Sequence, residues 1–341
     1  MKYKYLIIGS RATDDPKTHG GTTLLVKQLL EYFDEHDKDY IFIQAMKYSG
    51  KFSFIWNYFQ VIFNTLIHIR KVDIVLVNVS NNGAYFLSPF VLFITKIFHK
   101  KFVFRRFAGN FLETYKKTNV MKKKLIDFVL KNADIIFFEP KYLVSHYEKV
   151  RPNVYWFPNI RKRTSYIRDI NQPYTKKFVF LGQIREEKGI DEILEAFKLL
   201  SNEYSIDLYG NLFQEKYNET LFREYSNVSY KGLVHNEQVY EVLSKYDVLV
   251  LPSYMEGYPG VLIEAFAVGL PVISTDLESI KEMVDDNGIL IKSKSSKQLL
   301  EAIQSYNVEN YLKYSELSLK KFEEFEYEET YKRIVKICEE E

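Results

Sequence analysis

The chain is 341 residues long, which is enough for two domains with a hydrophobic core each, and its 27% of charged residues and mean hydropathy of −0.24 are typical of a soluble globular protein. A single cysteine, Cys338, excludes an internal disulfide and suits a reducing compartment, so we expect a cytoplasmic protein. The net charge of +2 divides into +14 over residues 1–170 and −12 over residues 171–341, which predicts an anionic partner for the first half. No nucleic-acid-binding motif accompanies the basic and aromatic residues of that half, so an anionic membrane surface is the favoured partner.

Runs typical of strands alternate with runs typical of helices along the whole chain, which is the pattern of parallel sheets with crossover helices. No signal-peptide pattern precedes the first strand. A helix is expected over residues 22–33, and a polar, basic linker over residues 161–177. The strands expected in the first half cover residues 5–9, 40–44, 74–77, 102–105, 135–138 and 154–157.

Two apolar segments lie between these strands. Residues 51–71 (KFSFIWNYFQVIFNTLIHIRK) have basic ends and many aromatic side chains, and they predict either a core helix or a helix in a membrane interface. Residues 84–98 form the longest apolar stretch, but they contain Pro89 and are too short for a membrane span, which needs about 20 apolar residues. We expect residues 84–98 to form a buried helix.

A glycine-bearing loop follows the first strand and opens a helix. His19, Gly20 and Gly21 precede Thr22 and Thr23 there. Paired glycines let a ligand approach the backbone closely, and a helix N-terminus favours an anion. The alternative is a helix cap formed by one of the threonines. The absence of Gly-x-Gly-x-x-Gly argues against a dinucleotide site of the dehydrogenase type.

Arg105, Arg106 and Asn110 stand at the end of a predicted strand. They are candidates for contacts with a ligand. Basic residues that only end a strand are an equally good interpretation.

The pattern of strands and helices restarts after the linker. Strands are expected over residues 178–181, 206–209, 228–230 and 247–251, and helices over residues 190–200, 238–245, 327–340 and from about residue 261. Two successive doubly wound domains imply a ligand cleft at the carboxyl ends of the strands.

The turn over residues 182–189 follows a strand and precedes a helix. Glycines bound it, and Lys188 can place an ammonium group over a diphosphate without a metal. The alternative is a solvated loop with salt-bridged charges.

The segment from Pro252 to Ala265 follows an apolar strand and leads through a turn into a helix. Such a helix start is an anion site, most naturally for phosphate. Carboxylates repel phosphate, so Glu256 in the turn and Glu264 in the helix need another role, and an ionised carboxylate can accept two hydrogen bonds from vicinal hydroxyls. The pair therefore suggests a sugar on one side of a diphosphate and a ribose on the other. A capped helix with two solvated glutamates is the alternative.

Residues 248–275 resemble the signature of retaining GT-B glycosyltransferases of family 4, with two glutamates separated by seven residues in a Pro-Ser-x-x-Glu-Gly-x-Pro context. The resemblance implies an α/β GT-B fold of two doubly wound Rossmann-like domains facing a cleft. The implied domains are an acceptor domain over residues 1–165, a nucleotide-sugar domain over residues 166–324, and a C-terminal helix over residues 325–341 that packs on the first domain.

The resemblance also implies roles for the residues at matching positions. Glu264 would hold the ribose hydroxyls, Glu256 the sugar hydroxyls, and Lys188 the departing diphosphate. Other donor contacts are implied for Gly20, Gly21, Gly182, Gln183, Gly257, Tyr258, Pro259, Gly260, Val261 and Leu233, and acceptor or sugar contacts are candidates for His19, Arg105, Arg106 and Asn110.

Two residues of the family pattern are missing from this chain. The arginine expected after the first glycine of the turn is Gln183, and Arg185 is the candidate that replaces it. The histidine that many members carry near the sugar is absent from residues 105–110.

The resemblance implies a retaining, metal-independent hexosyltransferase without a cofactor, which uses a nucleotide-sugar donor, in the first instance a UDP-sugar. The basic first half suggests a lipid-linked glycan acceptor at the inner face of the cell membrane, in the synthesis of bacterial capsule, O-antigen or exopolysaccharide. A GT-B UDP-sugar epimerase and a catalytically silent GT-B partner subunit are the alternatives.

Overall fold

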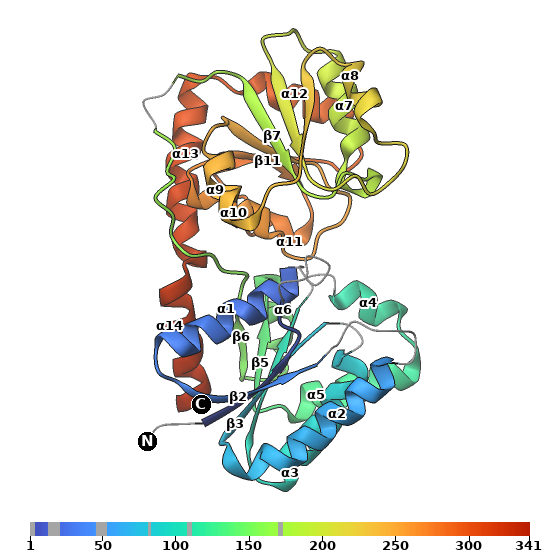
Figure 1. Cartoon of the computed structure of the whole chain (residues 1–341), viewed down its shortest axis with the longest axis vertical. Helices are drawn as coiled ribbons and strands as arrows, with labels where there is room; N and C mark the ends of the chain where they lie inside the picture. The colour runs from blue at the N-terminus through green and yellow to red at the C-terminus, as the bar shows by residue number, and fades with distance from the viewer. Residues whose placement is uncertain (1–3, 13–20, 46–52, 81–82, 108–110, 170–172) are drawn as a thin grey trace. The chain divides into compact units, whose positions relative to one another are not determined.

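The computed structural model describes all residues except 1–3, 13–20, 46–52, 81–82, 108–110 and 170–172, and the chain divides into two compact units (Figure 1). The first unit comprises residues 1–158 and 328–341, and the second comprises residues 159–327. The first segment of the first unit ends at residue 158, before the expected boundary at residue 165, because the backbone of Arg161 already pairs with Glu326 of the second unit. None of the helices over the described residues combines the length and apolar composition that crossing a bilayer requires.

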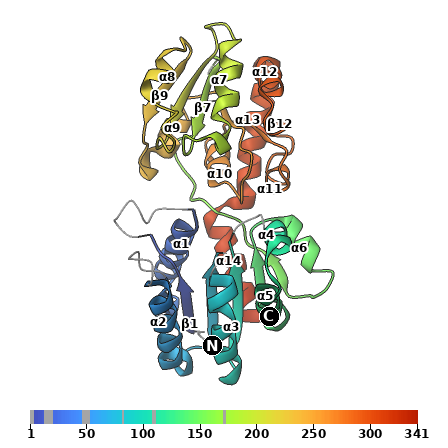
Figure 2. The same ribbon diagram turned by 90° about the vertical axis from the view of Figure 1, so that its right-hand side faces the viewer.

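The first unit is a parallel six-stranded sheet in the order β2-β1-β3-β4-β5-β6. Its helices α1 and α14 cover one face, and α2, α3 and α5 cover the other (Figures 1 and 2). The strands are β1 (Lys4–Gly9), β2 (Asp39–Gln44), β3 (Ile74–Val79), β4 (Lys101–Arg106), β5 (Ile135–Phe138) and β6 (Val154–Trp156). The helices are α1 (Gly21–Glu35), α2 (Ser53–His68), α3 (Ser88–Ile97), α4 (Phe111–Lys117), α5 (Val120–Asn132), α6 (Lys141–Tyr147) and α14 (Tyr327–Glu340).

The C-terminal helix α14 packs on α1 within this unit. The hydroxyl of Tyr331 donates to the carbonyl of Leu25 at 3.3 Å, and its ring lies 4.9 Å from that of Tyr32. The hydroxyl of Tyr5 on β1 donates to Glu339 at 3.1 Å. Residues 328–341 are therefore part of the first unit, although more than half of the chain separates them from its last strand.

The second unit is a parallel six-stranded sheet in the order β12-β11-β10-β7-β8-β9. The strands are β7 (Lys177–Leu181), β8 (Ser205–Tyr209), β9 (Val228–Gly232), β10 (Val248–Leu251), β11 (Val272–Thr275) and β12 (Gly288–Ile291). The helices are α7 (Ile190–Lys198), α8 (Glu219–Arg223), α9 (Val239–Leu243), α10 (Gly260–Ala267), α11 (Glu278–Lys281), α12 (Ser296–Ser305) and α13 (Val308–Phe322). Both units are thus the doubly wound α/β domains that the alternating sequence pattern predicts.

The segment predicted as a linker is partly built into the second unit. Arg168 is buried and donates to the carboxylate of Asp247 and to the carbonyl of Tyr246. The other carboxylate oxygen of Asp247 accepts from the backbone amides of Thr175 and Lys177, both at 2.8 Å. A carboxylate buried before β10 needs these donors, so it holds the described part of the segment against the domain.

The prediction of a buried helix over residues 84–98 is only half right. A π-helical turn, η3 (Gly83–Leu87), leads into α3, and one side of both is in the core. Aromatic side chains at Phe86, Phe90 and Phe93 face outward and are exposed. Helix α2 likewise exposes an aromatic stripe, so the outer faces of two neighbouring helices are apolar.

Candidate functional site

The two signature loops of the second unit meet where its strand order reverses. After β9 the chain returns to the other side of β7 to form β10, so the loops after β7 and β10 lie side by side at the carboxyl edge of the sheet, where doubly wound folds bind ligands. The amide of Tyr254 donates to the carbonyl of Glu187 at 2.9 Å. Gly189 has φ +76°, and a Cβ there would collide with the carbonyl of Pro252. The close approach of the loops therefore requires glycine at position 189.

Lys188 and Glu256 form an ion pair at this junction. Lys188 ends the short turn η4 (Glu186–Lys188), and its Nζ lies 2.5 Å from Oε1 of Glu256. The lysine and glutamate side chains are only 17% and 11% exposed. The hydroxyl of Ser253 donates to the same oxygen at 2.7 Å. The site thus holds one cation and one carboxylate in a fixed geometry. The roles that the sequence interpretation gives them, at a diphosphate and at sugar hydroxyls, stay predictions.

Hydrogen bonds from neighbouring elements hold the backbone of the Glu256 loop in place. The hydroxyl of Thr275, at the end of β11, donates to the carbonyl of Ser253 at 2.8 Å. The hydroxyl of Ser279 on α11 donates to the carbonyl of Glu256 at 3.1 Å. The sequence interpretation gave no role to Ser253, although this serine stands in the signature pattern, and it did not name Ser279.

Helix α10 begins directly after the Glu256 turn. Pro259 occupies the N-cap position, and no side chain caps the helix. The positive end of the helix dipole and its first amides are thus available to an anion. Tyr258 is buried, and its carbonyl accepts from the side chain of Asn159 at 2.5 Å, which fixes the approach to the helix.

Glu264 lies one turn into α10 and is paired with Arg161. The Nε of Arg161 donates to Oε1 of Glu264 at 2.7 Å, and these side chains are 13% and 18% exposed. The sequence interpretation did not find this contact, because Arg161 lies 103 residues away in a segment taken as a linker.

The other predicted donor residues occupy the same edge of the sheet without joining the ion pair. Gly182 and Gln183 follow β7, and Gln183 is exposed. Arg185 lies with its guanidinium 5.7 Å from the Phe213 ring centroid and 3.9 Å from Glu187. Leu233 follows β9 and is exposed. The carbonyl of Arg185 accepts from the amide of Lys188 at 3.0 Å, but over the described residues its guanidinium forms no hydrogen bond or ion pair with Glu256, so its substitution for the family arginine stays a prediction.

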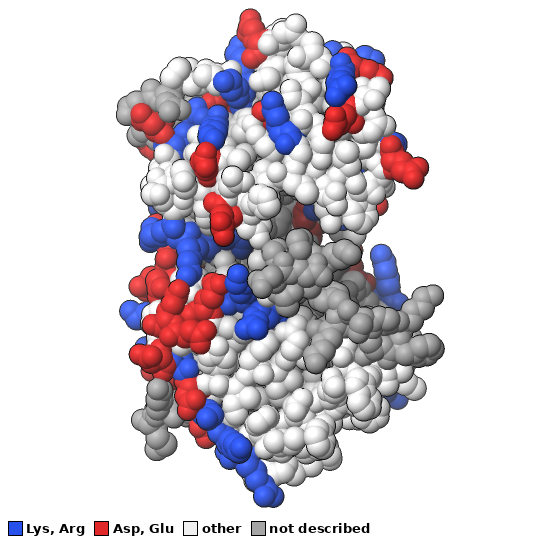
Figure 3. Space-filling model, viewed as in Figure 1, with Lys and Arg blue, Asp and Glu red and all other residues white. Residues whose placement is uncertain are grey.

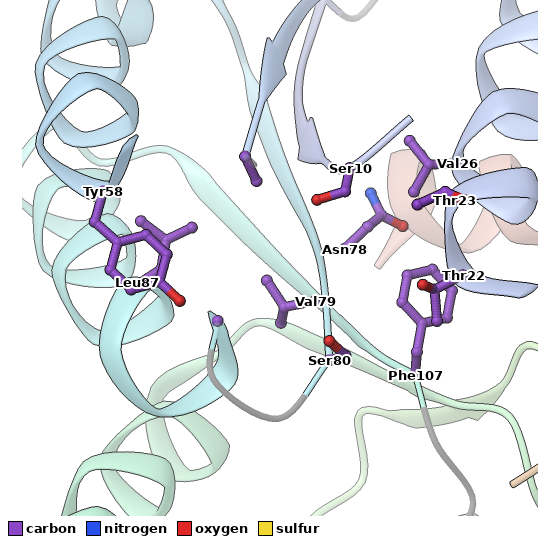
Figure 4. A pocket seen from close by; sticks show the side chains of 12 residues that line it. Ser10, Thr22, Thr23, Val26, Tyr58, Asn78, Val79, Ser80, Leu87 and Phe107 are labelled. Carbon is purple, nitrogen blue, oxygen red and sulfur yellow. The ribbon is translucent and has the colours of Figure 1, made fainter. Parts of the chain in front are cut away.

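A cavity of about 70 Å³ lies at the corresponding point of the first unit, where the strand order reverses between β1 and β3 (Figure 4). The start of α1 supplies Thr22 and Thr23 to it, and Asn78 and Ser80 come from the end of β3. Asn78 is 3% exposed, and its Oδ1 has no hydrogen-bond partner among the described residues. The lining offers neutral hydroxyl and amide groups, which suit sugar hydroxyls.

Arg105 and Arg106 do not offer their side chains to a ligand. They are 0% and 1% exposed, and their guanidinium groups lie over the rings of Phe157 and Phe111, at 3.4 and 4.3 Å from the centroids. Burial lowers the pKa of each to about 10. The candidate ligand contact is corrected to a role inside the first unit, because aromatic faces and the strand end enclose both groups.

Gly21 is the first residue of α1 and is exposed. His19, Gly20 and Asn110 lie outside the described residues. Across the described ranges, no group of three His, Cys, Asp or Glu side chains is placed to hold a metal ion.

Parts of the chain are similar in sequence to known proteins. Residues 164–317 match the family model described as "Glycosyl transferases group 1". A segment of the chain is 38% identical over 132 residues to the putative teichuronic acid biosynthesis glycosyltransferase TuaC of Bacillus subtilis, covering 38% of this chain and 33% of that protein. A segment of 119 residues is 31% identical to the N,N'-diacetylbacillosaminyl-diphospho-undecaprenol alpha-1,3-N-acetylgalactosaminyltransferase of Campylobacter jejuni, covering 34% of this chain and 31% of that protein. The matches thus span about a third of each relative.

Among solved structures, the chain is similar to the Anabaena protein HepE in complex with UDP. The TM-score is 0.76 at 12% sequence identity, and the similarity covers 98% of this chain and 99% of that one. At this identity the similarity shows the fold alone, and it extends over both units.

Proposed function

Because residues 164–317 match the model for glycosyl transferases group 1 and the whole chain has the GT-B fold, we propose that this protein transfers a sugar from a nucleotide-diphosphate donor to a glycan acceptor with retention of anomeric configuration. The observation that carries the proposal is the Lys188–Glu256 pair beside the uncapped start of α10. A cation and free amides suit a diphosphate, and the carboxylate suits the hydroxyls of a sugar.

In the proposed reaction the second unit holds the donor. Glu264 accepts hydrogen bonds from the ribose, and Glu256 accepts them from the sugar. The bond between the anomeric carbon and the diphosphate oxygen breaks, and its electron pair leaves with the diphosphate. The acceptor hydroxyl oxygen bonds to the anomeric carbon on the same face, and its proton passes to a phosphate oxygen of the leaving group. Lys188, with Arg185 in support, stabilises the negative charge that develops there.

A screen of nucleotide-sugars by thermal unfolding tests the donor proposal. A ligand that binds only the folded protein raises its apparent stability, by about 2.7 kcal/mol at 100 times the dissociation constant. UDP-sugars are the first candidates, because the similar Anabaena structure contains UDP. Failure of UDP-, GDP-, ADP- and dTDP-sugars alike to raise the unfolding temperature would contradict the proposal.

The acceptor is proposed to be a lipid-linked glycan of bacterial surface polysaccharide synthesis. The names of two relatives support this, one through teichuronic acid biosynthesis and the other through a diphospho-undecaprenol acceptor. The neutral cavity beside Asn78 and Thr22 is a candidate position for an acceptor hydroxyl group.

The reaction is proposed to need no metal. Lys188 and the start of α10 supply the positive charge that a divalent cation would otherwise bring to the diphosphate. Transfer is therefore expected to persist in EDTA, measured as product formation with and without chelator. Loss of activity in EDTA that Mg²⁺ or Mn²⁺ restores would refute the metal-independent mechanism.

We propose that α2 and α3 place the first unit against the inner face of the cell membrane. Trp56, Phe59 and Phe63 recur at helical spacing on α2, as do Phe90 and Phe93 on α3, and each is between 57 and 66% exposed. In Figure 3 the face over these helices is largely free of charged side chains. This pattern favours the interface interpretation of residues 51–71 over the core interpretation.

Basic residues border this aromatic surface. Arg70 and Lys71 follow α2, and Lys96 is in the last turn of α3. The Nζ of Lys122 on α5 lies 5.3 Å from the Phe86 ring centroid. An apolar aromatic face with cations at its edge is typical of a helix pair in the interface of an anionic membrane.

The protein is expected to bind vesicles that contain anionic lipid and to be partly released as salt rises, because exposed charges are screened beyond about 8–10 Å at physiological ionic strength. The aromatic residues are expected to leave a salt-resistant fraction. The double substitution Phe63→Gln and Phe93→Gln should abolish that fraction, measured by co-sedimentation at low and high salt.

Leu199→Gln is the matched control, since Leu199 is 71% exposed on the second unit. It should co-sediment like the unaltered protein. Failure to bind anionic and neutral vesicles alike at low salt would remove the membrane proposal. Unchanged binding by the double variant would mean that α2 and α3 are not the contact surface.

A further inference from the structure

Arg161 has a fixed backbone at the start of the second unit. Its amide donates to the carbonyl of Phe325 at 3.0 Å, and its carbonyl accepts from the amide of Tyr327 at 3.1 Å. Arg161 and Glu326 thereby form an isolated parallel bridge. A long, flexible side chain thus begins from a rigid point, which limits where its guanidinium group can lie.

The guanidinium of Arg161 lies along the first turn of α10. Its Nε donates to Oε1 of Glu264 at 2.7 Å, and its Nη1 donates to the carbonyl of Ile160 at 2.8 Å. A Cβ at Gly260 would collide with Nη2. Residues 260 and 264 are one turn apart and share a face of the helix, so the guanidinium spans that face from the bare Cα of Gly260 to the carboxylate.

Gly260 is not required by its backbone conformation. It is not among the glycines with positive φ, and it lies at the first position of the helix, where alanine is better tolerated than glycine. What the absent side chain provides is space for Arg161. This gives position 260 a function separate from the main-chain contact that the family resemblance implies.

A cation beside the N-terminal end of a helix is electrostatically unfavourable by itself, because the dipole is positive there. Glu264 compensates for it, and the pair is largely shielded from solvent. Only one of the two carboxylate oxygens is used: over the described residues, Oε2 of Glu264 accepts no hydrogen bond. A carboxylate anchored through one oxygen presents the other in a defined direction.

We propose that Arg161 is a positioning residue, which holds Oε1 of Glu264 so that Oε2 meets the ribose hydroxyls of the donor, and that Gly260 provides the space for it. This inference rests on the proposed function and on the ribose role of Glu264. An anchored carboxylate loses less side-chain freedom when the ribose binds, so the arginine raises donor affinity without touching the donor.

Isothermal titration with UDP and with 2',3'-dideoxyuridine diphosphate tests the inference, since the second ligand lacks the hydroxyls that Glu264 would bind. Arg161→Ala is expected to weaken UDP binding about tenfold, or about 1.4 kcal/mol, and to leave binding of the dideoxy ligand unchanged. Gly260→Ala keeps the arginine but displaces its guanidinium, so it should show the same ligand-specific loss.

The double variant Arg161→Ala with Gly260→Ala should bind UDP no more weakly than Arg161→Ala alone, because the methyl group then has nothing to displace. Arg163→Ala is the matched control. That arginine is two residues away and pairs with Glu323 at an exposed site, at 2.6 Å, so both ligands should bind as they do to the unaltered protein.

Glu264→Gln separates failure of this inference from failure of the proposed function. Glu264→Gln can weaken binding of UDP and leave binding of 2',3'-dideoxyuridine diphosphate unchanged. If it does so while the Arg161→Ala and Gly260→Ala variants bind UDP normally, only the positioning role is overturned. An equal loss for both ligands in Arg161→Ala would also overturn it, since this would indicate a general charge or folding effect. If the unaltered protein binds none of UDP, GDP and ADP, the donor site itself is refuted, and the inference with it.

Discussion

Replacing Lys188 with Met is expected to lower turnover about 100-fold, the equivalent of about 2.7 kcal/mol in the activation free energy. Methionine keeps the length and apolar stem of the side chain but removes the charge proposed to stabilise the departing diphosphate. The same change leaves Glu256 without its cation at a position that is only 11% exposed. Turnover should be measured at saturating donor, with thermal unfolding as the check on folding.

Lys216→Met is the control for this substitution. Lys216 pairs with Glu186 and Asp191 at 2.9 Å, close to the same turn, but its side chain is 45% exposed. Its loss should leave turnover nearly unchanged, because exposed ion pairs contribute little. A Lys188→Met enzyme that works as fast as the unaltered one would contradict the role of the lysine at the diphosphate.

Replacing Glu256 with Gln is expected to lower turnover at least about tenfold, or about 1.4 kcal/mol, with the fold intact. Glutamine preserves size, but it weakens the charge-assisted hydrogen bonds proposed to the sugar hydroxyls. The effect should appear in turnover as well as in donor affinity if these bonds strengthen as the sugar reacts.

Glu278→Gln serves as the matched control, since Glu278 lies on nearby α11 with its side chain 72% exposed. The variant with both Lys188→Met and Glu256→Gln should lose less than the two single losses combined, because each residue already loses its partner in the single variant. Full activity of Glu256→Gln would exclude the sugar contact.

The sequence was a good guide to the elements of the sheets, because strand periodicity and turn residues are local properties. Strand β5 spans residues 135–138 and helix α14 residues 327–340, as expected from the apolar runs and helical spacing. The strand at residues 288–291 and the two helices that follow it, α12 and α13, were not predicted, since their apolar pattern is short and interrupted. The signature glutamates were found because their context is itself a short stretch of sequence.

Contacts between distant segments depended on the tertiary structure. Lys188 and Glu256 are 68 residues apart, and they meet because β10 adds beside β7 rather than beside β9. The same holds for Arg161 and Glu264, which no spacing rule connects. Arg105 and Arg106 illustrate the converse: their sequence suggests exposed cations, but the aromatic rings of Phe157 and Phe111 enclose them.

The outer faces of α2 and α3 separate what the sequence alone predicts from what only the tertiary structure decides. The sequence alone predicted that residues 51–71 and 84–98 are apolar and contain helices, but apolar residues all round a helix do not reveal which side meets the sheet. Packing decided that Val61 and Val91 enter the core, whereas Phe63 and Phe93 face outward. Sequence periodicity therefore fixes what each segment can form, while the order of the strands fixes which surfaces are covered, because burial depends on neighbours that lie far away along the chain.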